Sequence, residues 1–283
     1  MNRKIDIVII ALTLCWPVLA LAQLNVVYPA IEERASDNYG YKILDLALSK
    51  SGRSYHLSVS PLKMNQQRAR ASMADGSISI FDTGTSAEFE DRFRAIYFPI
   101  DRGISGYRLF IINKRLAPEF AAIKNIDGLR KETAGQGPGW ADIKILQKAG
   151  INVQTAEFKS LFTMVEIGRF DFFPLGIEEI YPLLDQRRQQ APNSVVEQTL
   201  ALHYPFARLF FVRKDNKELH DAVMAGLELA FVDGSLQKLM DNDDAFKAAR
   251  LRANLANRTI IEVDNPNLTQ RFKEMPSKYF ALP

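Results

Sequence analysis

Two runs decide the fold of this chain, and they read Met73-Ala74-Asp75-Gly76-Ser77-Ile78-Ser79-Ile80-Phe81 and Val165-Glu166-Ile167-Gly168-Arg169-Phe170-Asp171-Phe172-Phe173. Each run predicts the end of a helix, a left-handed glycine that closes the helix, and a strand that follows. Each also completes a longer strand–helix–strand–helix–strand repeat, the first over Leu24–Thr83 and the second over Leu129–Pro174.

Alternating strands and helices predict an α/β fold, because parallel strands are joined through crossover helices. Two such units in one chain predict two similar lobes, each a mixed sheet flanked by helices, with a crevice between them. Ligands of such folds bind in the crevice outside the carboxyl ends of the strands.

Two extended runs mark the expected crossings between the lobes. Gly106–Ile112 and Tyr204–Val212 are both strand-like and predict a two-stranded hinge. Apolar residues recur at helical spacing after the second run, and these helices are expected to pack back on the first lobe. Lobe 1 is therefore predicted over 23–109 and 210–283, and lobe 2 over 110–209.

The N-terminal segment has the pattern of a secretory signal. Arg3-Lys4 is a basic start, Ile7–Leu14 is an apolar run, and Ala20-Leu21-Ala22 offers small residues for cleavage. The apolar run is shorter than the ~20 residues that a membrane span needs. Residues 1–22 are therefore predicted to be a cleaved signal peptide, which places the protein in the periplasm.

The composition excludes several classes of partner. With 36 basic and 33 acidic residues, the net charge of +3 is too balanced to indicate nucleic acid or an anionic membrane as a partner. The single cysteine, Cys15, lies in the predicted signal peptide, so no disulfide is expected. The protein is expected to be a monomer.

No motif for catalysis or metal binding stands out. The chain has no Gly-x-Ser-x-Gly elbow, and its scattered histidines, His56, His203 and His220, are not spaced as ligands of one metal. The run Gly135–Gly139 opens a helix after a strand, but its third glycine is misplaced for a dinucleotide fingerprint, and Pro138 lacks an amide N–H. We expect no catalytic residue, no metal and no cofactor.

The same glycine-rich run supplies the lobe 2 candidates for ligand binding. It leaves a helix N-terminus whose amides attract anions, beside Gly137 and Trp140. Trp140 would stack on a ligand or only cover the turn, and Asp142 would cap the helix if no ligand binds there.

The lobe 1 candidates follow the third strand. Thr83 and Thr85 would bind a ligand or cap the next helix, and Arg92 is the better candidate for a charged fork on a carboxylate. Tyr28 ends the first strand, so its ring is expected near the rim of the crevice.

These residues resemble the periplasmic solute-binding proteins of family 3, the amino-acid-binding class, over nearly all of the chain after residue 22. The resemblance is carried by Leu161–Asp171, Phe211–Ser235 and Asp91–Pro99. In the last of these the spacing from Arg92 to Phe98 matches the carboxylate-binding arginine of the family. The resemblance implies the two-lobed periplasmic-binding-protein fold of type II.

The chain departs from the family at three points, which indicates a divergent subgroup. Phe89 replaces the usual Thr or Ser three residues before the arginine, and Pro138-Gly139-Trp140 stands where a Gly-Ser/Thr pair is usual. The aspartate that holds an α-ammonium would fall at Gly176, with Glu178 and Glu179 nearby. Glu178 is therefore the remaining ligand-binding candidate.

The resulting prediction is an exported protein that closes on a small, carboxylate-bearing solute and presents it to a membrane permease of an ABC transporter. One alternative is a periplasmic sensory or interaction protein with a weak or vestigial cleft. Another is a dehydratase-like enzyme on the same scaffold, with Glu178 or Glu179 as a general acid.

Overall fold

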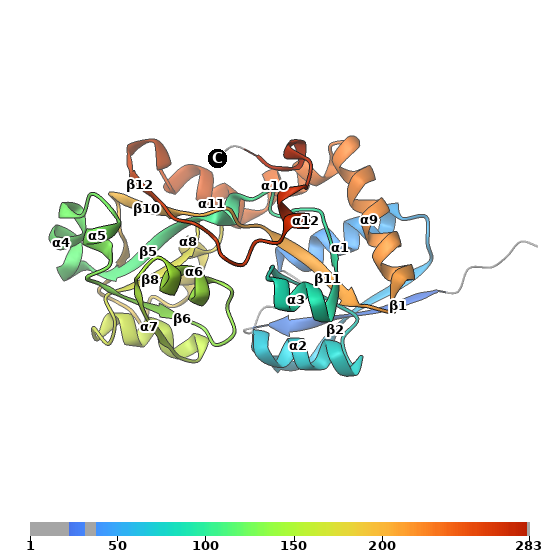
Figure 1. Ribbon diagram of the computed structural model, residues 1–283, viewed down its shortest axis with the longest axis horizontal. Coiled ribbons are helices and arrows are strands. Elements are labelled where there is room, and N and C mark those ends of the chain that lie inside the picture. The colour runs from blue at the N-terminus through green and yellow to red at the C-terminus, as the bar shows by residue number, and fades with distance from the viewer. Residues whose placement is uncertain (1–22, 32–37, 282–283) are drawn as a thin grey trace, which may run out of the picture.

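The computed structural model describes residues 23–31 and 38–281, so the predicted signal peptide lies outside the described residues. The chain forms two lobes side by side, each with strands at its centre and helices packed around them (Figure 1). The two-lobed α/β fold predicted from the repeat is confirmed.

Lobe 1 contains two groups of strands. β1 (Leu24–Ile31) pairs in parallel with β2 (Tyr55–Met64). β11 (Arg208–Arg213) lies between β3 (Ile80–Gly84) and β4 (Phe93–Ile96) and is antiparallel to both. The helices of this lobe are α1 (Tyr39–Lys50), α2 (Gln66–Asp75), α3 (Ala87–Arg92), α9 (Lys217–Val232) and α10 (Ser235–Asn242).

Lobe 2 contains one sheet in the order β12-β10-β5-β8-β6-β7, and β9 also pairs with β5. The strands are β5 (Tyr107–Asn113), β6 (Thr133–Gln136), β7 (Asn152–Thr155), β8 (Phe172–Gly176), β9 (Ser194–Val196), β10 (Leu200–His203) and β12 (Thr259–Glu262). The helices are α4 (Ala117–Ala122), α5 (Ile126–Leu129), α6 (Asp142–Lys148), α7 (Phe158–Glu166), α8 (Ile180–Gln186) and α11 (Asp244–Arg252).

The predicted repeat is present in both lobes, as β1-α1-β2-α2-β3 and as β6-α6-β7-α7-β8. Its glycines carry the expected positive φ, which is 83° at Gly76 and 71° at Gly168. A residue with a Cβ is strained in this region, so glycine ends α2 and α7 and turns the chain into the following strand. The repeat brings the ends of β3 and β8 to the same space between the lobes.

The described part of the chain passes between the lobes four times, rather than twice as the predicted two-stranded hinge implies. The runs predicted to cross, Gly106–Ile112 and Tyr204–Val212, mostly lie within the lobe sheets as β5 and β11, and the chain crosses just before these strands, at 97–106 and 204–207. Residue 243, between α10 and α11, is a third. The segment 263–269 is a fourth and leads to α12 (Gln270–Lys273).

The assignment of 210–283 to lobe 1 therefore needs correction. β12 pairs in parallel with β10 at the edge of the lobe 2 sheet, and α11 buries Ala249 in the lobe 2 core. Strand addition of this kind satisfies backbone groups of β10 that would otherwise form an open edge. The chain then returns, because Phe272 and Tyr279 are buried in the core of lobe 1.

Two helices of lobe 1 meet closely at Gly226 of α9, where a Cβ would lie 1.8 Å from the carbonyl oxygen of Ala47 in α1. Gly226→Ala should lower the free energy of unfolding by about 2–3 kcal/mol, because the two helices must separate. Leu229→Ala on the exposed face of α9 is the control and should stay within about 0.5 kcal/mol of the wild type in urea denaturation. Equal stability of the two variants would contradict this account of the packing.

Candidate functional site

A cavity of about 80 Å³ lies between the lobes, at the position of the predicted crevice. Its walls come from both lobes and from the first two crossings, so a molecule inside it touches both halves of the protein. The lining residues are Tyr28, Ile31, Asn38, Gln66, Phe81, Asp82, Thr83, Gly84, Ser105, Arg108, Trp140, Ala141, Asp142, Glu178, Glu179, Phe206 and Arg208.

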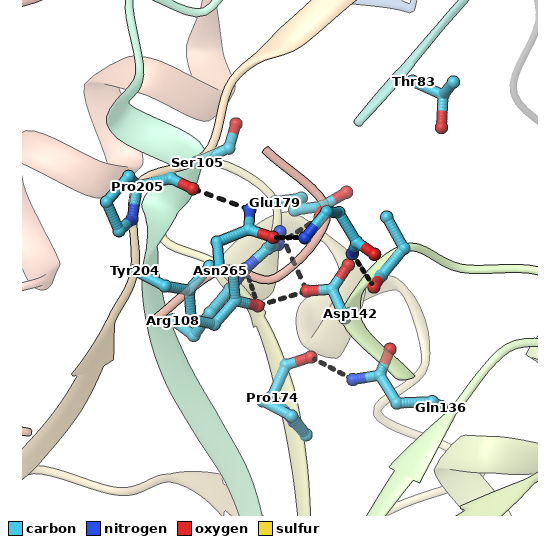
Figure 2. Close-up of polar contacts among 12 residues, drawn as sticks. Thr83, Ser105, Arg108, Gln136, Asp142, Pro174, Glu179, Tyr204, Pro205 and Asn265 are labelled. Atoms are coloured by element: carbon cyan, nitrogen blue, oxygen red, sulfur yellow. Dashed lines mark hydrogen bonds and ion pairs between the residues drawn. The ribbon is translucent and has the colours of Figure 1, made fainter. Parts of the chain in front are cut away.

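The lobe 2 wall carries a buried group of Arg108, Asp142 and Tyr204 (Figure 2). The Nη2 atom of Arg108 lies 2.9 Å from Oδ1 of Asp142, and its Nε donates to the Tyr204 hydroxyl at 2.8 Å. Tyr204 in turn donates to Asp142, which closes a three-membered network. The guanidinium also lies 4.6 Å from the centroid of the Phe206 ring, a cation–π contact.

The lobe 1 wall carries a second group of the same residue types. Nε of Arg208 donates to Oδ2 of Asp82 at 2.9 Å, and its Nη2 donates to the same oxygen. The Tyr28 hydroxyl donates to Oδ1 of Asp82. Each lobe therefore lines the cavity with one Arg–Asp pair that a tyrosine supports, and of the two tyrosines only Tyr28 lines the cavity itself.

The aspartates stabilise the charged form of both arginines. Burial opposes the charge of a guanidinium, but the carboxylates of Asp142 and Asp82 outweigh it, so the pKa of Arg108 and of Arg208 lies above the usual value. Buried ion pairs of this kind need both members, since removal of one leaves an uncompensated charge.

Glu178 lies at the back of the cavity with only 3% of its surface exposed. The Ser105 hydroxyl donates to its Oε1, whereas its buried Oε2 has no hydrogen-bond partner within the described residues. Burial raises the pKa of Glu178 to about 7, and the nearby carboxylates of Glu179 and Asp101 add to this effect. Burial likewise raises the pKa of Asp101, which accepts from the backbone N–H of Arg208 at 3.1 Å.

Four of the seven predicted site residues line the cavity, namely Tyr28, Thr83, Trp140 and Glu178. The hydroxyl of Tyr28 lies at the cavity wall, where it donates to Asp82. Trp140 also covers the turn, because a Cβ at Gly137 would lie 2.5 Å from the indole ring. Trp140 therefore covers the turn, and its stacking on a ligand stays a prediction.

The placement predicted for the other three residues is corrected. Arg92 is the exposed last residue of α3 and packs 5.6 Å from the centroid of the Phe93 ring, outside the cavity walls. Thr85 is buried and donates its hydroxyl to Glu90. Gly137 lies behind Trp140. Arg92 is exposed at the end of α3 and does not line the cavity, so its spacing to Phe98 matches the family while its position does not.

Arg108 and Arg208, with their aspartates, are the site residues that sequence reasoning missed. A signal for the arginines is present, since both predicted crossing strands contain the run Arg-Leu-Phe, at Arg108-Leu109-Phe110 and at Arg208-Leu209-Phe210. A charged residue in an apolar, buried strand is rarely placed there without a partner. Asp142 was expected to cap its helix, but its carboxylate binds Arg108 instead, and Ala141 precedes α6 without a side-chain cap.

The raised pKa of Glu178 predicts a pH dependence of stability. Folding raises the pKa above its unfolded value near 4.3, so the stabilising contribution is complete below that value and is lost as the pH rises through about 7. Glu178→Gln should therefore melt above the wild type at pH 8 by about 3–6 °C, and the difference should narrow as the pH falls to 5 and close near pH 4. The control is Glu157→Gln at an exposed position. A constant difference across this range would contradict titration of Glu178.

The sequence matches no protein-family model and none of the curated proteins compared with it. The structure, in contrast, is similar to solved binding proteins. The amino-acid ABC-transporter substrate-binding protein AbpA from Streptococcus pneumoniae, bound to L-arginine, gives a TM-score of 0.54 at 17% identity, over 80% of this chain and 95% of that one.

Two further structures widen the functional range of the similar proteins. A histidine kinase sensor domain with similarity to periplasmic binding proteins gives a TM-score of 0.58 at 10% identity, over 78% of this chain and 96% of that one. The ancestral amino-acid-binding protein AncCDT-1, a precursor of cyclohexadienyl dehydratase, gives a TM-score of 0.56 at 15% identity, over 78% of this chain and 95% of that one. At these identities the similarity establishes the fold, which is that of the two-lobed periplasmic binding proteins, in a divergent sequence.

No group of three or more His, Cys, Asp or Glu side chains in residues 23–31 and 38–281 is arranged to hold a metal ion. In the same residues no helix has the length and apolar character needed to cross a bilayer.

Proposed function

We propose that this chain is an exported solute-binding protein whose two lobes close on a small solute in the periplasm. The observation that carries the proposal is the cavity between the lobes, which each lobe lines with one Arg–Asp ion pair. A solute that contacts both lobes binds best when they are together, so it favours the closed state by its differential affinity.

The residues proposed to contact the solute come from both walls. Tyr28 and Thr83 would do so from lobe 1, and Trp140 and Glu178 from lobe 2. The ring of Trp140 lies 6.0 Å from that of Phe173, which belongs to the lobe 2 core, so the indole is fixed at the cavity wall. Residues in rigid elements hold a solute with little loss of conformational freedom.

The proposed partner is a membrane permease of an ABC transporter, and the protein is proposed to act as a monomer that does not bind nucleic acid. Binding proteins of such transporters share this fold. A closed form would present a surface made of both lobes, which a partner can distinguish from the open form.

A sensory protein with a weak cleft is the second candidate, and one observation favours it. The guanidiniums in the cavity already pair with carboxylates of the same lobe, which leaves fewer groups for a solute. A histidine kinase sensor domain also has this fold. A sensor would need to report closure to a kinase or cyclase rather than deliver a solute.

A thermal-shift screen of the protein from Gln23 onward against a solute library tests the proposal. In that protein Trp140 is the only tryptophan. A solute that raises the melting temperature should also quench or shift the Trp140 emission, because closure changes the access of water to the indole. Solution scattering should show a more compact particle.

The Trp140→Phe variant is the control and should keep the compaction while it loses the emission. A verified solute that changes neither signal would count against closure and would favour the sensory candidate. Turnover of a prephenate-like acid would instead favour the dehydratase alternative, with Glu178 or Glu179 as a general acid.

A further inference from the structure

We propose that the cavity selects a small cation of the protonated-amine class that carries no carboxylate, and that the cation binds the carboxylate of Glu178. This inference rests on the proposed solute-binding function and names the class of solute. It departs from the carboxylate-bearing solute that the resemblance implies.

The first argument is the balance of charge in the cavity wall. Within the described residues, the wall contains four carboxylates, on Asp82, Asp142, Glu178 and Glu179, and two cations, on Arg108 and Arg208. With all six groups ionised the wall is negative. A cationic solute reduces this excess, and an anionic solute adds to it.

The second argument is that the wall offers no cation for a carboxylate of the solute. Arg108 is bound to Asp142 at 2.9 Å and Arg208 to Asp82 through two of its nitrogens. A solute carboxylate would have to displace these aspartates and leave them buried without a counter-charge, which is strongly unfavourable. Arg92, the expected carboxylate anchor, lies outside the wall.

The third argument is the state of Glu178. Its Oε1 accepts from Ser105, but its buried Oε2 has no hydrogen-bond partner within the described residues. A buried acceptor without a donor is uncommon in folded proteins and marks a place that a ligand can complete. An ammonium N–H supplies a donor and a charge of the right sign.

Size and shape limit the cation further. A cavity of about 80 Å³ has room for roughly five to eight water-sized groups. The rings of Phe81, Phe206 and Trp140 line it, and these suit a short apolar chain and attract a cation to their faces. A primary amine on a chain of about four carbons fits this description.

The inference also predicts proton release on binding. In the empty cavity Glu178 with a pKa of about 7 is about half protonated at pH 7. A bound cation favours the carboxylate, so binding should release up to about half a proton at this pH. Binding of an anionic solute would favour the protonated form of Glu178 and would therefore cause proton uptake instead.

Calorimetry at pH 7 with a matched four-carbon set tests the inference. The probes are butane-1,4-diamine, 1-aminobutane, 4-aminobutanoate and butanoate, each titrated in two zwitterionic buffers of different ionisation enthalpy. The two amines should bind with proton release, 4-aminobutanoate should bind at least about tenfold more weakly than 1-aminobutane, and butanoate should not bind.

Glu178→Gln should weaken binding of the amines by about tenfold or more and abolish proton release, while the exposed Glu157→Gln control should change neither. Proton release by the wild type needs no variant, so the test survives if Glu178→Gln folds poorly. Binding of a carboxylate probe as tightly as 1-aminobutane, or no binding of either amine at millimolar concentration, would overturn the inference. The proposed function would then still stand if another solute in the library binds, and would fail only if none does.

Discussion

Arg258→Ala is expected to lower the free energy of unfolding by about 3–5 kcal/mol. The Arg258 side chain is fully buried and donates to the carbonyl oxygens of Ala253, Glu197 and Leu200 at 2.6, 2.6 and 2.8 Å. Its guanidinium is also the cation nearest to the buried carboxylate of Glu197, at 3.6 Å. Truncation removes the side-chain donor of three carbonyl oxygens and the counter-charge of Glu197, whose carboxylate keeps its bonds from Thr199 and Leu200.

Urea denaturation measures this loss, and limited proteolysis should show new cleavage between residues 253 and 269. Arg250→Ala is the matched control, because Arg250 is half exposed and pairs with Asp241 at 3.2 Å. Such a pair contributes at most about 1 kcal/mol. If the two variants unfold at the same urea concentration, Arg258 does not anchor the C-terminal segment.

Arg208→Ala is expected to have an effect of similar size, about 3–5 kcal/mol, because it leaves Asp82 buried without its counter-charge. The positive charge of Arg208 also interacts with the buried carboxyl groups of Asp101 and Glu178. Its removal therefore makes the charged forms of these two acids less favourable as well.

A double-mutant cycle isolates the ion pair from the other contacts. Asp82→Asn keeps the acceptor for Tyr28 but removes the charge that Arg208 binds. The double variant Arg208→Ala/Asp82→Asn should therefore be less destabilised than the sum of the single variants, by about 0.5–3 kcal/mol. Additive losses within error would show that the pair contributes through packing alone.

The fold was predictable because its signals are local. A glycine after a helix and an apolar run after the glycine specify a turn and a strand without reference to the rest of the chain, and Gly76 and Gly168 both behave in this way. The two lobes then follow, since each repeat forms one α/β unit.

The site was less predictable because its signals are not local. Asp82 and Arg208 lie far apart in the sequence and meet only because β3 and β11 pair in the sheet. Arg92 illustrates the opposite error, since its spacing to Phe98 is right while the short α3 directs it to solvent. The crossing into β12 also depends on an open edge of β10, which no single segment encodes.

The four crossings have a consequence for the order in which the protein is made. The core of lobe 1 includes Val26 near the start of the chain and Phe272 and Tyr279 near its end. A chain that emerges from its N-terminus onward cannot finish lobe 1 until Phe272 and Tyr279 are free. Lobe 2 needs only residues up to β12, so it is the half that can be completed first. Lobe 1 therefore stays incomplete for as long as the segment that carries Phe272 and Tyr279 is missing.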